Sequence, residues 1–274
     1  MKYCRIIAEA TPPAGSFGRL LDDGTTIELI EGDVLPRADA PPGGARVAVD
    51  EVTTWLPPTP PPDIVALGKN YAEHAKEGGG EVPDAPVVFL KATSTLVGHR
   101  EPILLPLTNP DEVDYEAELA VVIGRAAKHV SRQDALSYVL GYTCAHDVSA
   151  RDCQLRIDGQ WARGKSFDTF CPLGPWIETE ADPSDLAVRL RLNGEVMQED
   201  TTKSLMFDVP RVIEHVSSFM TLRPGAVILT GTPAGVGFAR RPPRFLRDGD
   251  VARVEIDGVG VLENPVRREA APRA

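Results

Sequence analysis

The sequence is poor in cysteine and aromatic residues, and it has no long apolar run. Its cysteines, Cys4, Cys144, Cys153 and Cys171, are too sparse for a disulfide scaffold. No stretch approaches the roughly 18 consecutive apolar residues of a membrane helix. Residues 1–15 also lack the apolar segment of a secretory signal peptide. We therefore expect a cytoplasmic protein with reduced thiols and no membrane partner.

Positive charge is scarce as well. The chain of 274 residues has 29 basic against 40 acidic residues, a formal net charge of −11. A field of this sign repels nucleic acid and anionic membranes, so we exclude polynucleotide partners. An anionic substrate would need a local cluster of basic side chains. The length is sufficient for one large domain with a buried active site, or for one large and one small domain.

Apolar β-branched runs recur along the chain, whereas helical patterns are few. Strands are expected at residues 3–8, 16–21, 25–30, 46–49, 64–67, 87–90, 118–123, 187–192, 226–230 and 251–256. Helices are expected at residues 70–77, 131–139 and 209–220. Strands and helices do not alternate strictly, so the pattern predicts a mixed α/β, β-rich fold and not a doubly wound sheet.

A proline-rich segment divides the chain. Residues 55–63, WLPPTPPPD, contain five prolines and predict a stiff, extended connector. We therefore expect a small N-terminal β domain with its connector at residues 1–60. The catalytic domain is then expected at residues 61–274.

The most informative stretch is DEVDYEAELAVVIG, residues 111–124. Asp114, Glu116 and Glu118 take every second position, so a strand places them on one face. Ala120 and Val122 continue that face with apolar residues, which favours a partly buried face over a solvated one. Neighbouring buried carboxylates need a cation, or one must stay protonated. The pattern favours a divalent metal, although an exposed acidic face remains an alternative. Oxygen donors suit Mg²⁺, Mn²⁺ or Ca²⁺ better than Zn²⁺.

A third oxygen ligand is expected from Asp147, in the segment GYTCAHDVSARD. The alternative for this residue is an aspartate that caps a helix or forms a turn. A zinc site is a second alternative, because Cys144, His146, Cys153 and Cys171 lie in one region. The spacing contains no paired CxxC motif, so buried free thiols are the simpler interpretation.

The segment GKNYAEHAKEGGG, residues 68–80, predicts a short helix. Asn70 suits its N-cap and Glu73 the capping-box position. His74 and Glu77 are three residues apart and share a helix face. A carboxylate can fix the tautomer of a histidine and raise its basicity, which suits a general base. The alternative is an ordinary surface pair. The three glycines at residues 78–80 would let this helix move as a lid.

Other polar residues suit an anionic substrate. Lys165, between glycine and aromatic residues, is either a surface lysine or an anion ligand. Arg151 and Gln154 share one face of a turn, where both can bind a planar carboxylate. The loop TGTPAGVG fits neither a Walker motif nor a dinucleotide fingerprint. Its N–H groups and Thr232 can bind a carboxylate, unless it is only a tight turn. The basic run at residues 240–247 either meets a second carboxylate or is a solvated loop.

Taken together, these segments resemble the fumarylacetoacetate hydrolase family. The resemblance spans residues 63–266 and rests on GKNYAEHAKE, DYEAELAVVIG, GYTCAHDVSARDCQ, GKSFDTFCPLGPWI, LNGEVMQEDTTKSLMF and LRPGAVILTGTPAGVG, in this order. It implies a β-roll catalytic domain, a homodimer and one Mg²⁺ or Mn²⁺ ion. The N-terminal segment looks like the small β domain of many bacterial members. One departure is His146, where many relatives have asparagine.

The resemblance also implies roles for individual residues. Those at the metal-ligand positions are Glu116, Glu118 and Asp147. Those at the catalytic positions are the water-activating pair His74 and Glu77 and the active-site lysine Lys165. Those at positions that contact the substrate's carboxylate or oxo group are Arg151, Gln154, Lys165 and Thr232.

These roles imply an enzyme that acts on a small 2-oxo acid. The first expectation is hydrolysis of a C–C bond in an acylpyruvate, a 2,4-dioxo acid, with pyruvate leaving as its enolate. The alternative is decarboxylation or isomerisation of a related 2-oxo diacid, such as oxaloacetate or 2-hydroxyhepta-2,4-diene-1,7-dioate, as in aromatic catabolism. All of these reactions pass through an enolate, whose charge a divalent cation stabilises. A non-catalytic binding or assembly protein on the same fold is a further alternative.

Overall fold

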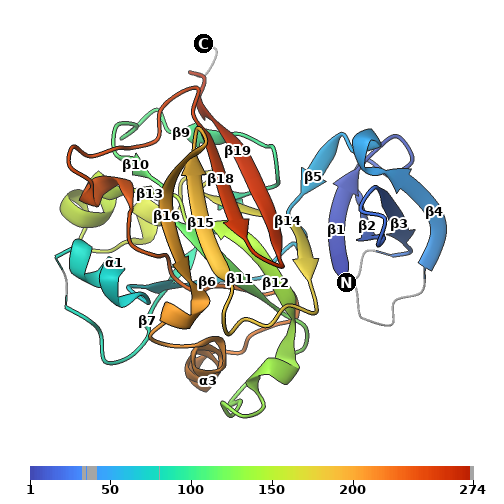
Figure 1. Cartoon of the computed structure of the whole chain (residues 1–274), viewed down its shortest axis with the longest axis horizontal. Helices are drawn as coiled ribbons and strands as arrows, with labels where there is room; N and C mark the ends of the chain where they lie inside the picture. The colour runs from blue at the N-terminus through green and yellow to red at the C-terminus, as the bar shows by residue number, and fades with distance from the viewer. Residues whose placement is uncertain (33–34, 36–41, 80, 272–274) are drawn as a thin grey trace.

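A computed structural model describes residues 1–32, 35, 42–79 and 81–271 of the chain. Within these residues strands far outnumber helices (Figure 1), which confirms the β-rich prediction. No helix among them is long and apolar enough to cross a membrane. Of the three glycines expected to hinge the lid, Gly80 lies outside the described residues.

The largest sheet runs through both halves of the chain. Its order is β4 (Pro42–Ala48), β3 (Thr26–Ile30), β2 (Ser16–Leu20), β1 (Lys2–Ile7), β14 (Cys171–Glu178), β12 (Val139–His146), β11 (Ala117–Ile123), β17 (Val227–Leu229), β6 (Ile64–Gly68) and β7 (Val87–Lys91). Two short strands join it from the side, β5 (Thr54–Leu56) on β1 and β8 (Leu96–Val97) on β14. All but two of these neighbouring pairs are antiparallel, the exceptions being β17 with β6 and β8 with β14.

A second sheet covers one face of the first. Its order is β16 (Glu195–Thr201), β15 (Ala187–Leu192), β18 (Val251–Ile256), β19 (Gly260–Arg268) and β9 (Ile103–Leu105). A small ladder pairs β10 (Val113–Asp114) with β13 (Ser149–Ala150). The α-helices are α1 (Ala72–Glu77), α2 (Ala162–Lys165) and α3 (Val209–Phe219). Single 3₁₀ turns lie at Val49–Glu51, Thr93–Thr95, Ala135–Tyr138, Thr202–Ser204 and Gly237–Ala239, and a π-helical turn at Cys153–Ile157.

The N-terminal strands lie beside the rest of the chain (Figure 1). They have a hydrophobic cluster of their own, which includes Ile6, Ile27 and Trp55. Strand β1 is also hydrogen-bonded to β14, with Lys2 opposite Glu178. The division near residue 60 stays a prediction, because the sheet continues across it.

Strand β11 is buried along its whole length, on both faces. Leu119 and Val121 pack into the large core between the two sheets, together with residues of β15 and β18. Ala120 and Val122 pack into a second cluster on the opposite face. A strand with two buried faces can carry a carboxylate only if other groups of the protein compensate for the lost water. The exposed acidic face is therefore wrong for this strand.

The helix expected at residues 131–139 is wrong. The structure has a turn that starts at Ser131, then a single 3₁₀ turn at Ala135–Tyr138, and then strand β12. The hydroxyl of Ser131 and the carboxylate of Asp134 hydrogen-bond each other, so the local signal produces a turn. Val139 is needed in the ladder, where it pairs with Ile123. Pairing with β11 outweighs the weak local preference for helix.

The capping role expected for Asn70 is also wrong, because α1 starts after Tyr71 without a side-chain cap. Asn70 is fully buried, and its amide donates to Thr230 O at 2.7 Å and to Phe207 O at 3.0 Å. Its Oδ1 accepts from Phe207 N at 2.9 Å. Asn70 thus joins three chain segments at the point where β6 leads into α1.

We expect Asn70→Ala to lower the free energy of unfolding by roughly 2–4 kcal/mol, because it leaves buried backbone groups of Thr230 and Phe207 without partners. Urea denaturation followed by fluorescence measures this change. The control is Glu73→Ala on the exposed side of α1, expected to change stability by less than about 0.5 kcal/mol. Equal stability of the two variants would show that Asn70 does not fix this junction.

Candidate active site

Antiparallel pairing of β11 and β12 brings the predicted ligands together. Ala117 lies opposite His146, so Glu116, just before β11, and Asp147, just after β12, meet at the same end of the ladder. Asp147 N donates to Glu116 O at 2.9 Å. Carboxylate oxygens of Glu116, Glu118 and Asp147 all lie within 4.8 Å of one another. These residues are 4%, 1% and 1% exposed, so water does little to screen their charges.

The charge of Glu116 is balanced by two cations, Arg151 and Lys165. Arg151 Nη2 donates to Oε1 at 2.6 Å and Lys165 Nζ donates to Oε2 at 2.7 Å. Burial acts to raise the pKa of Glu116, but the charges of Lys165 and Arg151 outweigh it and hold the pKa well below its usual range. This carboxylate therefore stays ionised.

Glu118 makes no ion pair within the described part of the chain. It accepts one hydrogen bond, from Gly231 N to Oε2 at 2.6 Å. Burial, together with the nearby Asp147 and Glu116, raises its pKa well above the usual range. Glu118 is therefore the carboxylate of this group whose charge requires an additional cation.

Asp147 lies between two lysines. Lys91 Nζ donates to Oδ1 at 2.5 Å, and Lys165 Nζ donates to Oδ2 at 2.7 Å. Burial acts to lower the pKa of Lys165, but Asp147 and Glu116 outweigh it and raise the pKa. Lys165 is thus an ammonium ion inside the site, and the interpretation as a surface lysine is wrong.

The ligand set fits a hard divalent cation. All three side chains offer carboxylate oxygen, and the charge of Glu118 is unpaired. Such donors suit Mg²⁺ or Mn²⁺. The zinc alternative finds no support, because the carboxylates form the only group of potential metal ligands among the described residues. Burial raises the pKa of Cys144 and of Cys171 to about 12, so both thiols stay protonated.

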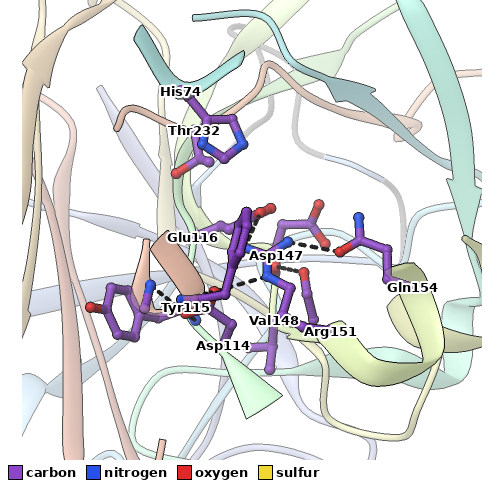
Figure 2. A network of polar contacts seen from close by, with 12 residues as sticks. His74, Asp114, Tyr115, Glu116, Asp147, Val148, Arg151, Gln154 and Thr232 are labelled. Carbon is purple, nitrogen blue, oxygen red and sulfur yellow. Dashed lines mark hydrogen bonds and ion pairs between the residues drawn. The ribbon is translucent and has the colours of Figure 1, made fainter. Parts of the chain in front are cut away.

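Arg151 and Gln154 lie on one face of the turn after β13, as predicted. Arg151 Nη1 donates to Gln154 Oε1 at 2.8 Å, and Arg151 Nε donates to Asp114 Oδ2 at 2.8 Å (Figure 2). Asp114 also accepts from Gly237 N and Phe238 N, so it orients the arginine. Gln154 lines the pocket, and its amide N–H₂ donates no hydrogen bond to any residue that the structure describes.

The glycine-rich loop after β17 does bind carboxylates, but they belong to the protein. Gly231 N donates to Glu118, and Gly235 N donates to Glu77 Oε2 at 2.9 Å. The hydroxyl of Thr232 donates to Ala117 O at 2.9 Å and accepts from Gln198 Nε2 at 2.8 Å. The loop therefore holds the metal ligands and the predicted base in fixed positions.

His74 and Glu77 form the predicted pair. His74 Nδ1 lies 2.9 Å from Glu77 Oε1, and both residues are half-buried. Figure 2 shows His74 beside Thr232, above Glu116. His74 lines the same pocket as Glu116 and Glu118. The pair is therefore not an ordinary solvated one, and the ring nitrogen Nε2 of His74 has no hydrogen-bond partner among the described residues.

Two residues that hold the site were missed by the sequence analysis. Lys91, at the end of β7, is 4% exposed and ion-paired with Asp147. Gln198, 1% exposed, accepts from Ala117 N at 2.9 Å and links it to Thr232 and Pro233. Neither carries a local signal, because each reaches the site through pairing between distant segments.

The basic run at residues 240–247 lies away from this pocket. Arg240 Nη2 donates to Met197 O at 2.6 Å, and Arg244 forms an ion pair with Asp250 at 2.8 Å. The pocket walls are instead formed by Leu67, Gly68, Lys69, His74, Ala75, Gly78, Phe89, Glu116, Glu118, Arg151, Gln154, Leu155, Trp161, Lys165, Thr232 and Phe238. The lining thus combines apolar side chains with the charged group formed by the carboxylate triad and its paired cations, which we call the inner site.

We expect Glu118→Gln to abolish metal binding while it stabilises the metal-free protein. An acid whose pKa is raised by folding loses stability as the pH rises above its unfolded value, here 4.5. Glutamine carries no charge at any pH, so the variant does not lose this stability. The difference in the free energy of unfolding between Glu118→Gln and the wild type should therefore grow as the pH rises above 4.5.

Thermal unfolding at several pH values, with and without Mn²⁺, measures both effects. At about 100 times its Kd, Mn²⁺ should stabilise the wild type by about 2.7 kcal/mol and leave Glu118→Gln unchanged. Retained stabilisation by Mn²⁺ in the variant would remove Glu118 from the ligand set.

Comparison with known proteins agrees with this geometry. The sequence model for the fumarylacetoacetate (FAA) hydrolase C-terminal domain matches residues 63–267. Human mitochondrial oxaloacetate tautomerase FAHD2A is 49% identical over 220 residues, which cover 79% of this chain and 70% of the relative.

The chain is also similar to two solved structures, and each match covers 98% of this chain and 100% of the chain in the solved structure. The 5-carboxymethyl-2-hydroxymuconate delta-isomerase from Mycobacterium smegmatis has 42% identity and a TM-score of 0.87. The fumarylacetoacetate hydrolase from psychrophilic Exiguobacterium antarcticum has 37% identity and a TM-score of 0.84. The chain belongs to the fumarylacetoacetate hydrolase family.

Proposed function

We propose that this enzyme is a divalent-metal-dependent tautomerase or isomerase of a 2-oxo diacid of the oxaloacetate type. The observation that carries the proposal is one pocket lined by His74, which is paired with Glu77, and by Glu116 and Glu118 of the buried carboxylate triad. A site of this kind can hold a 2-oxo acid and move a proton at the carbon next to its oxo group. This proposal replaces hydrolysis as the first expectation.

Glu116, Glu118 and Asp147 would hold Mg²⁺ or Mn²⁺. When bound, such an ion supplies Lewis-acid stabilisation of the negative charge that develops on the oxo oxygen. Lys165 adds a fixed positive charge next to the same carboxylates. Because its pKa is raised, Lys165 serves as an electrostatic group and not as the base.

His74 is the base in this proposal. With Nδ1–H donated to Glu77, Nε2 carries the lone pair and can accept the proton from C3 of the keto form. The C–H electron pair then forms the C2–C3 double bond, and the C=O π electrons move onto the oxygen, which takes up a proton from solvent to become the enol hydroxyl. The reverse transfer returns the proton from Nε2 to C3. Gly235 N keeps Glu77 in place for both directions.

The names of the relatives favour proton transfer. The human relative is named an oxaloacetate tautomerase, and the structure from Mycobacterium smegmatis a 5-carboxymethyl-2-hydroxymuconate delta-isomerase. Both names describe the movement of a proton between carbon and oxygen, or between carbons. The homodimer and the cytoplasmic location expected from the sequence remain predictions.

Hydrolysis of an acylpyruvate is the second candidate. The same His74–Glu77 pair can deprotonate a water molecule, which would attack the distal carbonyl. The relative from Exiguobacterium antarcticum is named a fumarylacetoacetate hydrolase. Hydrolysis requires that water reach the distal carbonyl beside His74, whereas tautomerisation requires no water.

We expect the metal-loaded protein to accelerate the conversion of enol to keto oxaloacetate, followed by the ultraviolet absorbance of the enol. Removal of the metal with a chelator should abolish the acceleration. His74→Ala should lose activity by roughly 10²–10⁴-fold, the usual contribution of a general base, while it still binds Mn²⁺. The control is Glu73→Gln, which lies on the same helix and faces solvent. An unchanged rate in His74→Ala would exclude His74 as the base.

For the second candidate, pyruvate release from acetylpyruvate is measured in a coupled dehydrogenase assay with Mg²⁺ or Mn²⁺. We expect release to be slower than the tautomerisation of oxaloacetate at equal substrate concentration, because hydrolysis also requires a water molecule to be bound and oriented beside His74. Faster release than tautomerisation would make hydrolysis the principal activity.

A further inference from the structure

Lys69 lines the same pocket as Glu116 and Glu118, but it forms no ion pair or hydrogen bond with the described residues of the inner site. It follows Gly68, the last residue of β6, and precedes the helix that carries His74. Its side chain is half-buried. Neither the proton-transfer step nor the metal site uses it.

The other cations near the site are already paired. Lys91, Arg151 and Lys165 each form an ion pair with a buried carboxylate at 2.5–2.8 Å. Lys69 has no hydrogen bond or ion pair with any described residue. It is thus a cation on the pocket wall that forms an ion pair with none of the residues that the structure describes.

The backbone of Lys69 is held in an unfavourable conformation. Its φ of 56° lies in the left-handed region, which costs a non-glycine residue on the order of 1 kcal/mol. The three hydrogen bonds of Asn70 hold the next residue in place. Gly231 approaches Asn70 so closely that an added Cβ would lie 2.7 Å from Asn70 Cβ. Strain that the surroundings enforce in this way is typical of functional positions.

The charge balance of the inner site shows what Lys69 can do. Asp114, Glu116, Glu118 and Asp147 face the three cations named above, which leaves one excess negative charge. A divalent cation converts this to one excess positive charge, which a single substrate carboxylate neutralises. A second carboxylate on the substrate has no partner in the inner site.

Two aromatic side chains of the pocket wall lie close to the segment that carries Lys69. Phe89 and Trp161 pack edge to face with ring centroids 5.6 Å apart. An added Cβ on Gly68 would lie 2.6 Å from the Trp161 ring, so the ring lies directly against the chain that leads to Lys69. Apolar walls strengthen an ion pair formed between them, because they exclude water.

We propose that Lys69 binds the second carboxylate of the substrate and makes the enzyme selective for 2-oxo diacids over 2-oxo monoacids. This inference rests on the proposed function, because it assigns the second carboxylate of the same substrate. Lys69 is a specificity-determining residue here, and it takes no part in proton transfer.

The test compares oxaloacetate with 2-oxobutyrate, which has the same chain length and a methyl group in place of the second carboxylate. Exchange of the C3 hydrogens in D₂O, followed by NMR on the Mn²⁺-free, Mg²⁺-loaded protein, reports proton transfer for both. Lys69→Asn removes the charge, and asparagine tolerates the left-handed backbone. Lys69→Arg keeps the charge.

We expect Lys69→Asn to reduce kcat/KM for oxaloacetate by about 10- to 100-fold more than for 2-oxobutyrate, the contribution of one charged hydrogen bond. The loss should appear mainly in KM. Lys69→Arg should recover part of the preference. The control Lys76→Asn, which removes an exposed lysine on α1 paired with Glu73, should leave the preference unchanged.

Calorimetric titration with both acids gives a second measurement that does not depend on turnover. If the wild type exchanges no hydrogens but Lys69→Asn selectively weakens oxaloacetate binding, the proposed function fails and the role of Lys69 stands. If exchange occurs and the preference is the same in Lys69→Asn and the wild type, the role of Lys69 is wrong and the proposed function stands. If Lys76→Asn loses as much of the preference for oxaloacetate over 2-oxobutyrate as Lys69→Asn does, the effect comes from surface charge in general and the role of Lys69 is wrong.

Discussion

Three carboxylates within 4.8 Å of one another, all shielded from water, repel each other strongly, and this repulsion governs the site. Such groups stay ionised only where positive charge compensates them. Glu116 and Asp147 receive that charge from lysine and arginine side chains. Among the described residues, Glu118 receives one backbone N–H and no ion pair. Its charge is thus left for a divalent cation to compensate, which would not be so if all three carboxylates were paired within the protein.

The sheet makes this costly arrangement rigid. Pairing of β11 with β12 fixes two ligands at one end of a ladder, and the buried apolar residues on both faces prevent the strand from sliding. A register shift of one residue would turn Glu118 to the opposite face. Glu77 is held by a loop N–H, but it belongs to a six-residue helix at the pocket rim. The predicted metal ligands therefore lie in or next to buried strands of the sheet, and the predicted base lies on a short helix that Gly235 N ties to the loop after β17.

Local sequence patterns correctly predicted several strands and the meeting of the three carboxylates. Residues 187–192 and 251–256 are strands with the predicted bounds, and Glu116, Glu118 and Asp147 meet because period-two spacing and strand pairing act together. Lys91 and Gln198 could not be predicted, because a single polar residue in a strand does not reveal which distant segment it will face. The helix at residues 131–139 failed for the same reason, since the pairing of Val139 with Ile123 is a long-range contact.

In the proposed function, the inner site would recognise the features that every 2-oxo acid shares, a carboxylate next to an oxo group. It therefore distinguishes poorly between substrates that differ only at the far end. Lys165 is held as an ammonium ion and His74 is oriented by Glu77, and both arrangements serve tautomerisation and hydrolysis equally. The choice of substrate would then depend on the rest of the pocket wall, which includes Phe89, Trp161 and Lys69. A short diacid that binds there has no distal carbonyl for water to attack, so selection of the substrate also selects the reaction.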